Sequence, residues 1–332
     1  MQHAASGALT DVTGLLVGHF THALRPTGCT VVIAPEGVVA GVDVRGAAPG
    51  TRETDLLEPG NVVDRVHAIV LSGGSAFGLD AATGVMRWLE EQKIGLPTPH
   101  GLVPIVPAAV LYDLASYDHG HDPTARPDAA CGYEAARLAR SPDHSNGNVG
   151  AGSGAMVGKL FGMASAMKGG LGQASVRSGG WTVSALIACN AVGDVVNDRD
   201  GRVLAGARDH AAKQFLNTEQ TLLGGGQALN LLAGSNTTIG VIACDARLDK
   251  AQARRLATCG HDGLARVIRP AHTLLDGDTL FAMGTGSRAQ TPDMLLLGVM
   301  AAKACALASV AAVTQARGLS TVHGFIPGAA DL

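Results

Sequence analysis

The residues best suited to covalent chemistry are two threonines at the point where a polar segment meets an apolar one. The segment Gly234-Ser-Asn-Thr-Thr-Ile239 leads into residues 240–244, a run typical of a buried strand. The hydroxyl of Thr237 could attack the carbonyl of Asn236, and water could open the resulting ester. The new chain would begin at Thr237 with a nucleophile and a free α-amine, whose pKa of roughly 7.7–8 suits a base at neutral pH. The alternative is a loop before an ordinary core strand, because threonine is a good strand former.

Two further polar side chains stand in apolar surroundings. Lys159 ends the glycine-rich tract 147–159, and Asn190 interrupts a long apolar run. A phosphate-binding loop would need glycine where Ser153 stands and Ser or Thr where Leu160 stands, so the tract does not predict nucleotide binding. An isolated lysine beside a strand is typical of a surface residue and gains interest only if it faces a nucleophile. A polar amide between two apolar halves needs a partner or has a function.

Two carboxylates stand one residue apart in Asp276-Gly277-Asp278. Calcium loops share this spacing, but the other ligands of an EF-hand are absent, and the pair could instead orient an ammonium group. A metal could also bind at the loop 118–122, which holds His119 and His121 between two aspartates. No second group of ligands lies at a suitable spacing. We therefore expect a solvated loop there. We expect neither a metal nor an organic cofactor for the chemistry, because Thr237 would supply both the nucleophile and the base.

The composition is that of a compact globular protein. The chain has 332 residues, of which 46% are hydrophobic and 45 are glycine, with a formal net charge of −3. The absence of a basic run and the 3% aromatic content argue against nucleic-acid binding. Six cysteines without a CxxC pair indicate reduced thiols, and no apolar leader precedes the polar start, so we expect a cytoplasmic location. The apolar run 294–313 is Ala-rich and contains Lys303, which favours a core helix over a membrane span.

Alternating strands and helices must position these groups. Residues 199–236 are polar and rich in Ala and Gly, so we expect an exposed linker that leads into Asn236. The turn signal Pro35-Glu36-Gly37 separates the first two of the following segments. The patterns predict strands at 29–34, 38–44, 67–71, 101–114, 181–196, 238–244 and 280–283, and helices at 81–91, 250–267 and from about 292.

The ordered set of motifs resembles a known family. It comprises Tyr112-Asp113, Lys159, Asn190, Asn236-Thr237-Thr238 and Asp276-Gly277-Asp278-Thr279, with Arg45-Gly46-Ala47 and Gly73-Gly74 as earlier landmarks. Together these residues are similar to the self-cleaving L-aminopeptidase/D-esterase family, which includes β-aminopeptidases and the nylon-oligomer (6-aminohexanoate oligomer) hydrolases. The resemblance runs through nearly the whole chain.

This resemblance implies a fold, a cut and a set of roles. The fold would be an α/β structure, a four-layer α-β-β-α sandwich of the N-terminal-nucleophile-hydrolase type. One domain would be cut into a large fragment 1–236 and a small fragment 237–332. Thr237 would be the nucleophile with its own amine as base. The remaining roles would fall to Lys159 beside that pair, Asn190 as oxyanion donor, Tyr112 as a second polar contact, and Asp276 with Asp278 as the acidic pair that orients Thr237.

The substrate stays open at this point. The Asn236-Thr237 junction is like that of the nylon-oligomer hydrolases, whereas the aminopeptidase branch is cut before a serine. We expect hydrolysis of amide bonds in small peptides or linear amide oligomers, with an aminopeptidase as the alternative. A non-catalytic binding protein with an intact Asn236–Thr237 bond is a more distant alternative. The resemblance also implies a homo-oligomer, a tetramer of processed protomers.

Overall fold

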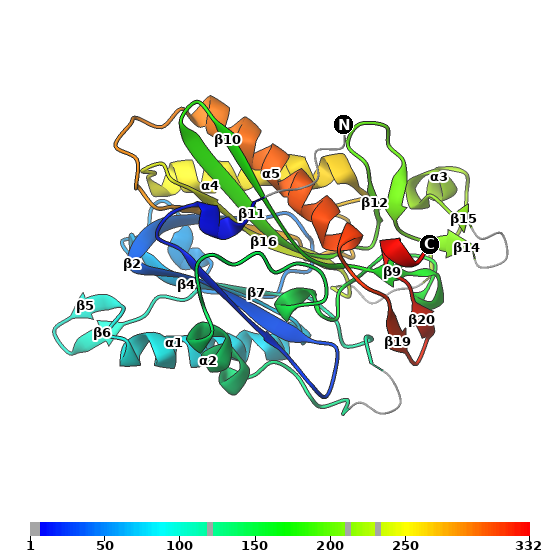
Figure 1. Ribbon diagram of the computed structural model, residues 1–332, viewed down its shortest axis with the longest axis horizontal. Coiled ribbons are helices and arrows are strands. Elements are labelled where there is room, and N and C mark those ends of the chain that lie inside the picture. Colours follow the sequence, from blue (N-terminus) through cyan, green and yellow to red (C-terminus); the bar gives the residue numbers. More distant parts are fainter. Residues whose placement is uncertain (1–6, 118–121, 210–213, 230–233) are drawn as a thin grey trace.

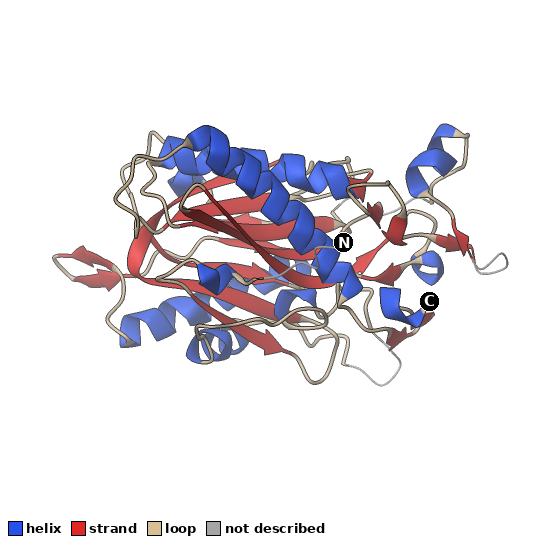
Figure 2. Ribbon diagram, turned by 45° about the horizontal axis from the view of Figure 1, so that its top comes forward, coloured by secondary structure: helices blue, strands red, loops and turns tan. Residues whose placement is uncertain are grey.

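Two β-sheets lie face to face, and two helices cover the outer face of each sheet (Figure 1, Figure 2). This arrangement comes from a computed structural model, which describes residues 7–117, 122–209, 214–229 and 234–332. Helices α4 (Lys250–Val267) and α5 (Met294–Thr314) cover one sheet, and α1 (Ala81–Glu91) and α2 (Ala129–Arg137) cover the other. The result is the expected four-layer α-β-β-α sandwich.

The sheet beneath α4 and α5 carries the candidate nucleophile. Its strand order is β10 (Gly170–Ser178), β11 (Trp181–Asn190), β16 (Thr237–Cys244), β18 (Thr279–Gly284) and the second half of β2 (Gly28–Val44). Strands β16 and β18 are parallel, and the other neighbours are antiparallel. Every residue of β16 and β18 is buried, because this sheet is covered on both faces.

The second sheet is built on the first half of β2. That half pairs with β1 (Leu16–Thr21) and β4 (Val66–Ser72), and β7 (Ala108–Val110) and β3 (Thr51–Arg52) extend the sheet beyond β4. The strand predicted at 67–71 is confirmed as β4. The predicted strand 101–114 is wrong as one element, because the chain forms β6 (Gly101–Val103) and β7 with an irregular segment between them.

The predicted turn at Pro35-Glu36-Gly37 is also wrong. The chain runs through it as one strand, and the register shifts between Ile33 and Val38. Gly37 has φ +65°, which suits a bulge in an otherwise extended strand. The proline and glycine therefore mark the place where β2 leaves one sheet and enters the other.

The helices follow their sequence signals closely. Helix α4 occupies the predicted residues 250–267 and begins with a capping box, in which Asp249 accepts from the Gln252 amide and the Gln252 side chain accepts from the Asp249 amide. Helix α1 likewise matches the predicted 81–91. Helix α5 begins after Asp293, whose carboxylate accepts from the amide of Leu296.

Helix α5 is a core helix, as expected. Its 21 residues and apolar composition would be sufficient for a membrane span. However, 72% of the most apolar stretch of this helix is buried inside the fold, where the helix packs on β10, β11 and α4. This burial accounts for its apolar composition.

Apolar side chains fill all three spaces between the four layers. In β16, Ile242 belongs to the apolar cluster that includes Leu256 of α4, whereas its neighbour Val241 belongs to the cluster that includes Phe281 in the layer between the sheets. A third layer, which includes Val85, lies between the second sheet and helices α1 and α2. The alternation of adjacent residues fixes the register of the central strands.

Short elements make up the rest of the described chain. The tract 147–159 is largely irregular rather than a strand, and residues 199–236 hold short elements within the predicted linker. The remaining strands are β5 (Leu96–Thr98), β8 (Met156–Val157), β9 (Met167–Lys168), β12 (Asp194–Val196), β13 (Val203–Ala205), β14 (Arg208–Asp209), β15 (Gln214–Phe215), β17 (Ile268–Arg269), β19 (Leu319–Thr321) and β20 (Gly324–Ile326), and the remaining α-helix is α3 (Thr218–Leu223).

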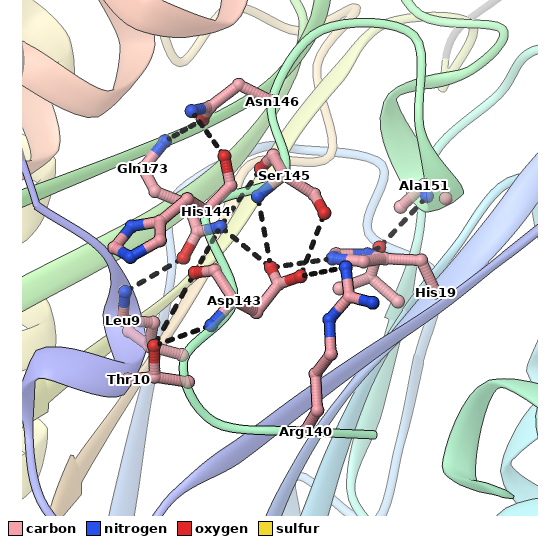
Figure 3. A network of polar contacts seen from close by, with 12 residues as sticks. Leu9, Thr10, His19, Arg140, Asp143, His144, Ser145, Asn146, Ala151 and Gln173 are labelled. Carbon is pink, nitrogen blue, oxygen red and sulfur yellow. Dashed lines mark hydrogen bonds and ion pairs between the residues drawn. The ribbon is translucent and has the colours of Figure 1, made fainter. Parts of the chain in front are cut away.

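A polar network joins the two sheets away from the candidate site (Figure 3). Asp143 accepts from Gln173 Nε2 on β10 at 3.1 Å and contacts His19 Nε2 on β1 at 3.1 Å. The other nitrogen of His19 lies 3.0 Å from the Thr30 hydroxyl, and Ser145 donates to Asp143 at 2.8 Å. The acid–imidazole–hydroxyl order is that of a hydrolase triad, but Thr30 is fully buried, so we assign the network a structural role.

Candidate active site

The ends of three neighbouring strands bring the candidate residues together. Asn190 ends β11 and lies directly opposite Thr237, which begins β16. Asp278 immediately precedes β18, the parallel neighbour of β16. Asp276 forms a parallel bridge with Asn236. Residues far apart in sequence therefore meet where these neighbouring strands begin or end.

The Asn236–Thr237 peptide is buried and held by a backbone donor. The exposed fraction is 0% for Asn236 and 2% for Thr237. The Thr237 hydroxyl donates to the carbonyl oxygen of Asn236. That oxygen also accepts from the Gly277 amide at 2.9 Å, which is where an oxyanion donor would lie if the carbonyl were attacked. A Cβ on Gly277 would approach the Ala48 carbonyl oxygen to 2.6 Å and the Thr237 hydroxyl to 3.0 Å, so glycine is required there.

Lys159 is buried and points to Asn190 and Ser235, which flank the candidate nucleophile, rather than to solvent. Its Nζ donates to the Asn190 backbone oxygen and to Asn190 Oδ1, both at 2.9 Å, and to the Ser235 carbonyl at 3.1 Å. Three oxygen acceptors match the three hydrogens of an ammonium group. Burial lowers the pKa of Lys159 to about 7, and the charge of Asp276 opposes that shift.

The orientation of the Asn190 amide is fixed by its donors. Its Oδ1 accepts from Lys159 and from the Met156 amide at 3.0 Å, so Nδ2 must point the other way. Nδ2 donates to the backbone oxygen of Tyr112 at 3.0 Å. Tyr112 therefore reaches this cluster through its main chain. An amide nitrogen has two hydrogens, and this bond uses one of them.

The two aspartates are held differently. Asp276 Oδ2 accepts from the amide and hydroxyl of Thr273, at 2.9 and 2.6 Å. Asp278 Oδ1 accepts from the Thr238 amide at 2.6 Å, and its Oδ2 lies 2.7 Å from His272 Nδ1. Burial, followed by the charge of Asp278, raises the pKa of Asp276 to about 6. Asp276 can therefore exchange a proton near neutral pH.

The sequence interpretation missed three contributors to this cluster, namely Gly277, His272 and Thr273. His272 and Thr273 were visible as polar residues in the loop before Asp276, but no spacing rule joins them to the aspartates. Gly277 was named only as the spacer between two carboxylates. Its use as a backbone donor depends on the pairing of Asn236 with Asp276, which the sequence does not reveal.

The arrangement is suited to acyl transfer. A hydroxyl, an ammonium group, amide donors and a carboxylate pair surround one carbonyl, as nucleophilic catalysis requires. Among the described residues, no group of three or more potential metal ligands comes together. The loop with His119 and His121 lies outside the described residues.

Comparison with known proteins shows the family of this chain. The model of peptidase family S58 matches residues 7–325. The chain belongs to this family. As a member of peptidase family S58 it is a hydrolase of peptide or amide bonds, and the resemblance stated from its motifs is confirmed.

Two kinds of S58 relative carry different names. An uncharacterized aminopeptidase of Mycobacterium leprae is 43% identical, covering 98% of this chain and 96% of that one. A 6-aminohexanoate-oligomer endohydrolase of Paenarthrobacter ureafaciens is 32% identical, covering 83% of this chain and 74% of that one. Both branches named from the motifs are thus represented.

Solved structures share the S58 fold. The L-aminopeptidase D-Ala-esterase/amidase of Ochrobactrum anthropi, described as a variant of the Ntn hydrolase fold, gives a TM-score of 0.72 at 21% identity. A β-aminopeptidase of a Burkholderia species gives 0.69 at 22% identity. Each comparison covers 98% of this chain and 91% of the other. The predicted fold class is confirmed.

Proposed function

We propose that this chain cuts itself between Asn236 and Thr237 and then hydrolyses amide bonds with Thr237 as an N-terminal nucleophile. The observation that carries the proposal is the contact of the Thr237 hydroxyl with the Asn236 carbonyl, whose oxygen the Gly277 amide already holds at 2.9 Å. Processing would give a fragment 1–236 and a fragment 237–332.

Self-cleavage follows from this contact. The Thr237 oxygen attacks the Asn236 carbonyl carbon, and the Gly277 amide stabilises the negative oxygen. Asp276 accepts the hydroxyl proton and returns it to the Thr237 nitrogen as the C–N bond breaks. Water then hydrolyses the ester, which leaves a carboxylate on Asn236 and a free amine on Thr237.

Hydrolysis of substrates reuses the same groups. The freed amine takes the proton of the Thr237 hydroxyl, which attacks the substrate carbonyl, and the second Nδ2 hydrogen of Asn190 supports the oxyanion. The leaving amine takes the proton, and water releases the acyl group from Thr237. The Lys159 ammonium, which donates to the Ser235 carbonyl just before the cut, would favour the neutral and therefore basic form of the new amine. The acidic pair orients the amine, and Tyr112 contributes a polar contact.

The proposed substrates are small peptides and linear amide oligomers of the 6-aminohexanoate type. The name of the 32% identical endohydrolase supports oligomers. The 43% identical relative named as an aminopeptidase supports a second candidate, release of N-terminal residues. Amine-blocked substrates separate the two, because an aminopeptidase requires a free amine whereas an endohydrolase also cuts blocked oligomers.

The test of processing is the intact mass of the purified protein beside its Thr237→Ala variant. We expect fragments of residues 1–236 and 237–332 in the wild type and one chain in the variant. A wild-type chain that stays whole after prolonged incubation would overturn the proposal and favour a binding protein. We further propose a cytoplasmic homo-oligomer, a tetramer of processed protomers, which native mass spectrometry would test.

A further inference from the structure

His272 contacts the carboxylate that holds the residue after the nucleophile. Its ring Nδ1 lies 2.7 Å from Asp278 Oδ2, and its own amide donates to the same oxygen at 3.2 Å. The other carboxylate oxygen accepts from the Thr238 amide at 2.6 Å. One aspartate thus joins the imidazole to the start of β16.

We propose that His272 is a positioning residue that fixes the Asp278 carboxylate on the backbone amide beside Thr237. The inference rests on the proposed function, since it concerns the geometry of the same nucleophile. Without the ring, Oδ2 would keep only the longer bond from the His272 amide, and the carboxylate could rotate away from Thr238. The Asn236–Thr237 peptide would then lose its alignment with the Gly277 amide.

The backbone of His272 supports this role. Its φ of +56° lies in the left-handed region, which residues other than glycine adopt uncommonly and at some cost, with Asn, Asp and His doing so more often than the rest. The loop keeps this conformation at a residue that donates twice to one carboxylate. The strained position therefore coincides with a specific side-chain contact.

The charges around the ring favour a cation at His272. Burial acts to lower the pKa of His272, but the hydrogen bond and charge of Asp278 raise it above its ordinary value, against the opposing charge of Arg45. From α4, the ring of His261 lies edge-on at 4.8 Å. His261 Nε2 lies 2.9 Å from the Asp43 carbonyl, and burial lowers the pKa of His261 to about 4, so it stays neutral.

A cation at this position also affects Asp276. The negative charge of Asp278 is one cause of the raised pKa of Asp276, and a protonated His272 partly neutralises that charge. Removing the cation should therefore let Asp276 take up its proton at a higher pH. A merely structural histidine would leave this titration unchanged.

Two substitutions separate the hydrogen bond from the charge. In His272→Asn, Nδ2 stands the same number of bonds from Cβ as the imidazole Nδ1, and asparagine tolerates a positive φ. In His272→Ala, both donor and charge are lost. Lys93→Ala is the matched control, because Lys93 has φ +59° in an exposed turn after α1 and measures the backbone cost alone.

The experiment follows self-cleavage of the full chain after cell-free synthesis, across pH 5–9, by fragment yield with time. We expect His272→Ala to cut about tenfold more slowly at pH 8. We expect His272→Asn to stay within about threefold of the wild type at pH 8. In the pH–rate profile of His272→Asn, the fall of the rate on the acidic side should move to higher pH by about half a pH unit. Lys93→Ala should match the wild type.

The outcomes are distinct. A wild-type rate and pH–rate profile in His272→Ala, or an equal loss at pH 8 in both variants, would overturn the role of His272. If the acidic side of the pH–rate profile is the same in His272→Asn and the wild type, the contribution of the His272 charge is overturned. Thr237→Ala runs beside them: if it is cut, or if the wild type is not, the proposed function itself fails. Melting temperatures confirm that the variants compared are folded.

Discussion

Lys168 and Asn190 are joined through a single peptide group. The fully buried Lys168 Nζ donates to the Ala155 carbonyl at 2.8 Å, and the amide of the same peptide, that of Met156, donates to Asn190 Oδ1 at 3.0 Å. Lys168 also donates to the carbonyls of Gly152 and Gly169, at 2.9 and 3.1 Å. A chain of polarised bonds thus supports the orientation of the candidate oxyanion donor.

Replacing Lys168 should destabilise the fold. In Lys168→Met, the carbonyl oxygens of Gly152, Ala155 and Gly169 each lose one buried hydrogen bond, so the free energy of unfolding should fall by about 2–4 kcal/mol. Urea unfolding would measure this. The control is Lys303→Met, since Lys303 pairs with Asp198 at the surface and should contribute less than about 1 kcal/mol. Equal stability of the two variants would contradict the prediction.

Replacing Lys159 should block processing beyond any loss of stability. We expect Lys159→Met to slow self-cleavage by about 10²-fold, because the charge beside Ser235 and the restraint on Asn190 are both lost. Lys250→Met is a close control, since Lys250 also donates to three carbonyls, those of Leu56, Asn61 and Val63, at a distance from this site. Fragment yield against time should separate the two. Similar cutting in both would contradict a role for Lys159.

A methyl group on Gly277 should impair cutting by a steric route. In Gly277→Ala, the new Cβ would lie too close to the Ala48 carbonyl oxygen and the Thr237 hydroxyl, which displaces the oxyanion donor. We expect self-cleavage to slow at least tenfold, or about 1.4 kcal/mol in barrier. Gly60→Ala serves as control, because nothing lies within 4 Å of a Cβ there. Mass spectrometry at fixed times would detect the difference, and wild-type rates in Gly277→Ala would refute it.

The Asp143 network should make stability depend on pH. Burial opposes the charge of Asp143, yet its bonds to His19 and Ser145 hold its pKa below the ordinary value. Its stabilisation is therefore present above the unfolded pKa near 4 and is lost as pH falls through the folded value. We expect Asp143→Asn to cost about 2 kcal/mol at pH 7 and progressively less toward pH 3. Urea midpoints at both pH values measure this, and a constant difference would contradict it.

Periodicity was sufficient to predict the helices and the central strands. Helices α1 and α4 have the predicted bounds because apolar spacing, joined in α4 by a capping box, decides a helix within one segment. The same local signals failed at Pro35 and Gly37, where a turn was predicted. Whether that pattern bends the chain or only shifts its register depends on the partners of β2 in two sheets.

The site divides in the same way. Thr237 could be named as a hydroxyl at the start of an apolar strand, Asn190 as a polar amide within an apolar run, and Asp278 as one of two closely spaced carboxylates. The bond between His272 and Asp278 could not be predicted, because it lies within one irregular loop whose backbone conformation, with φ +56° at His272, leaves no periodic signal. The bonds of Lys168 to the carbonyls of Gly152 and Ala155 depend on how an irregular segment packs on β9. A lysine in an apolar stretch looks the same in sequence whether it is exposed or buried on carbonyls.

The strand order β11-β16-β18-β2 has a consequence for the processed protein. The two strands that residues 237–332 contribute to this sheet, β16 and β18, lie between strands from residues 1–236. A cut before Thr237 would therefore leave the shorter polypeptide interleaved in the longer one and bonded along both sides. The two polypeptides would separate in denaturant but would remain one folded protein in native buffer. The freed amine of Thr237 would then be held in place by the surrounding sheet.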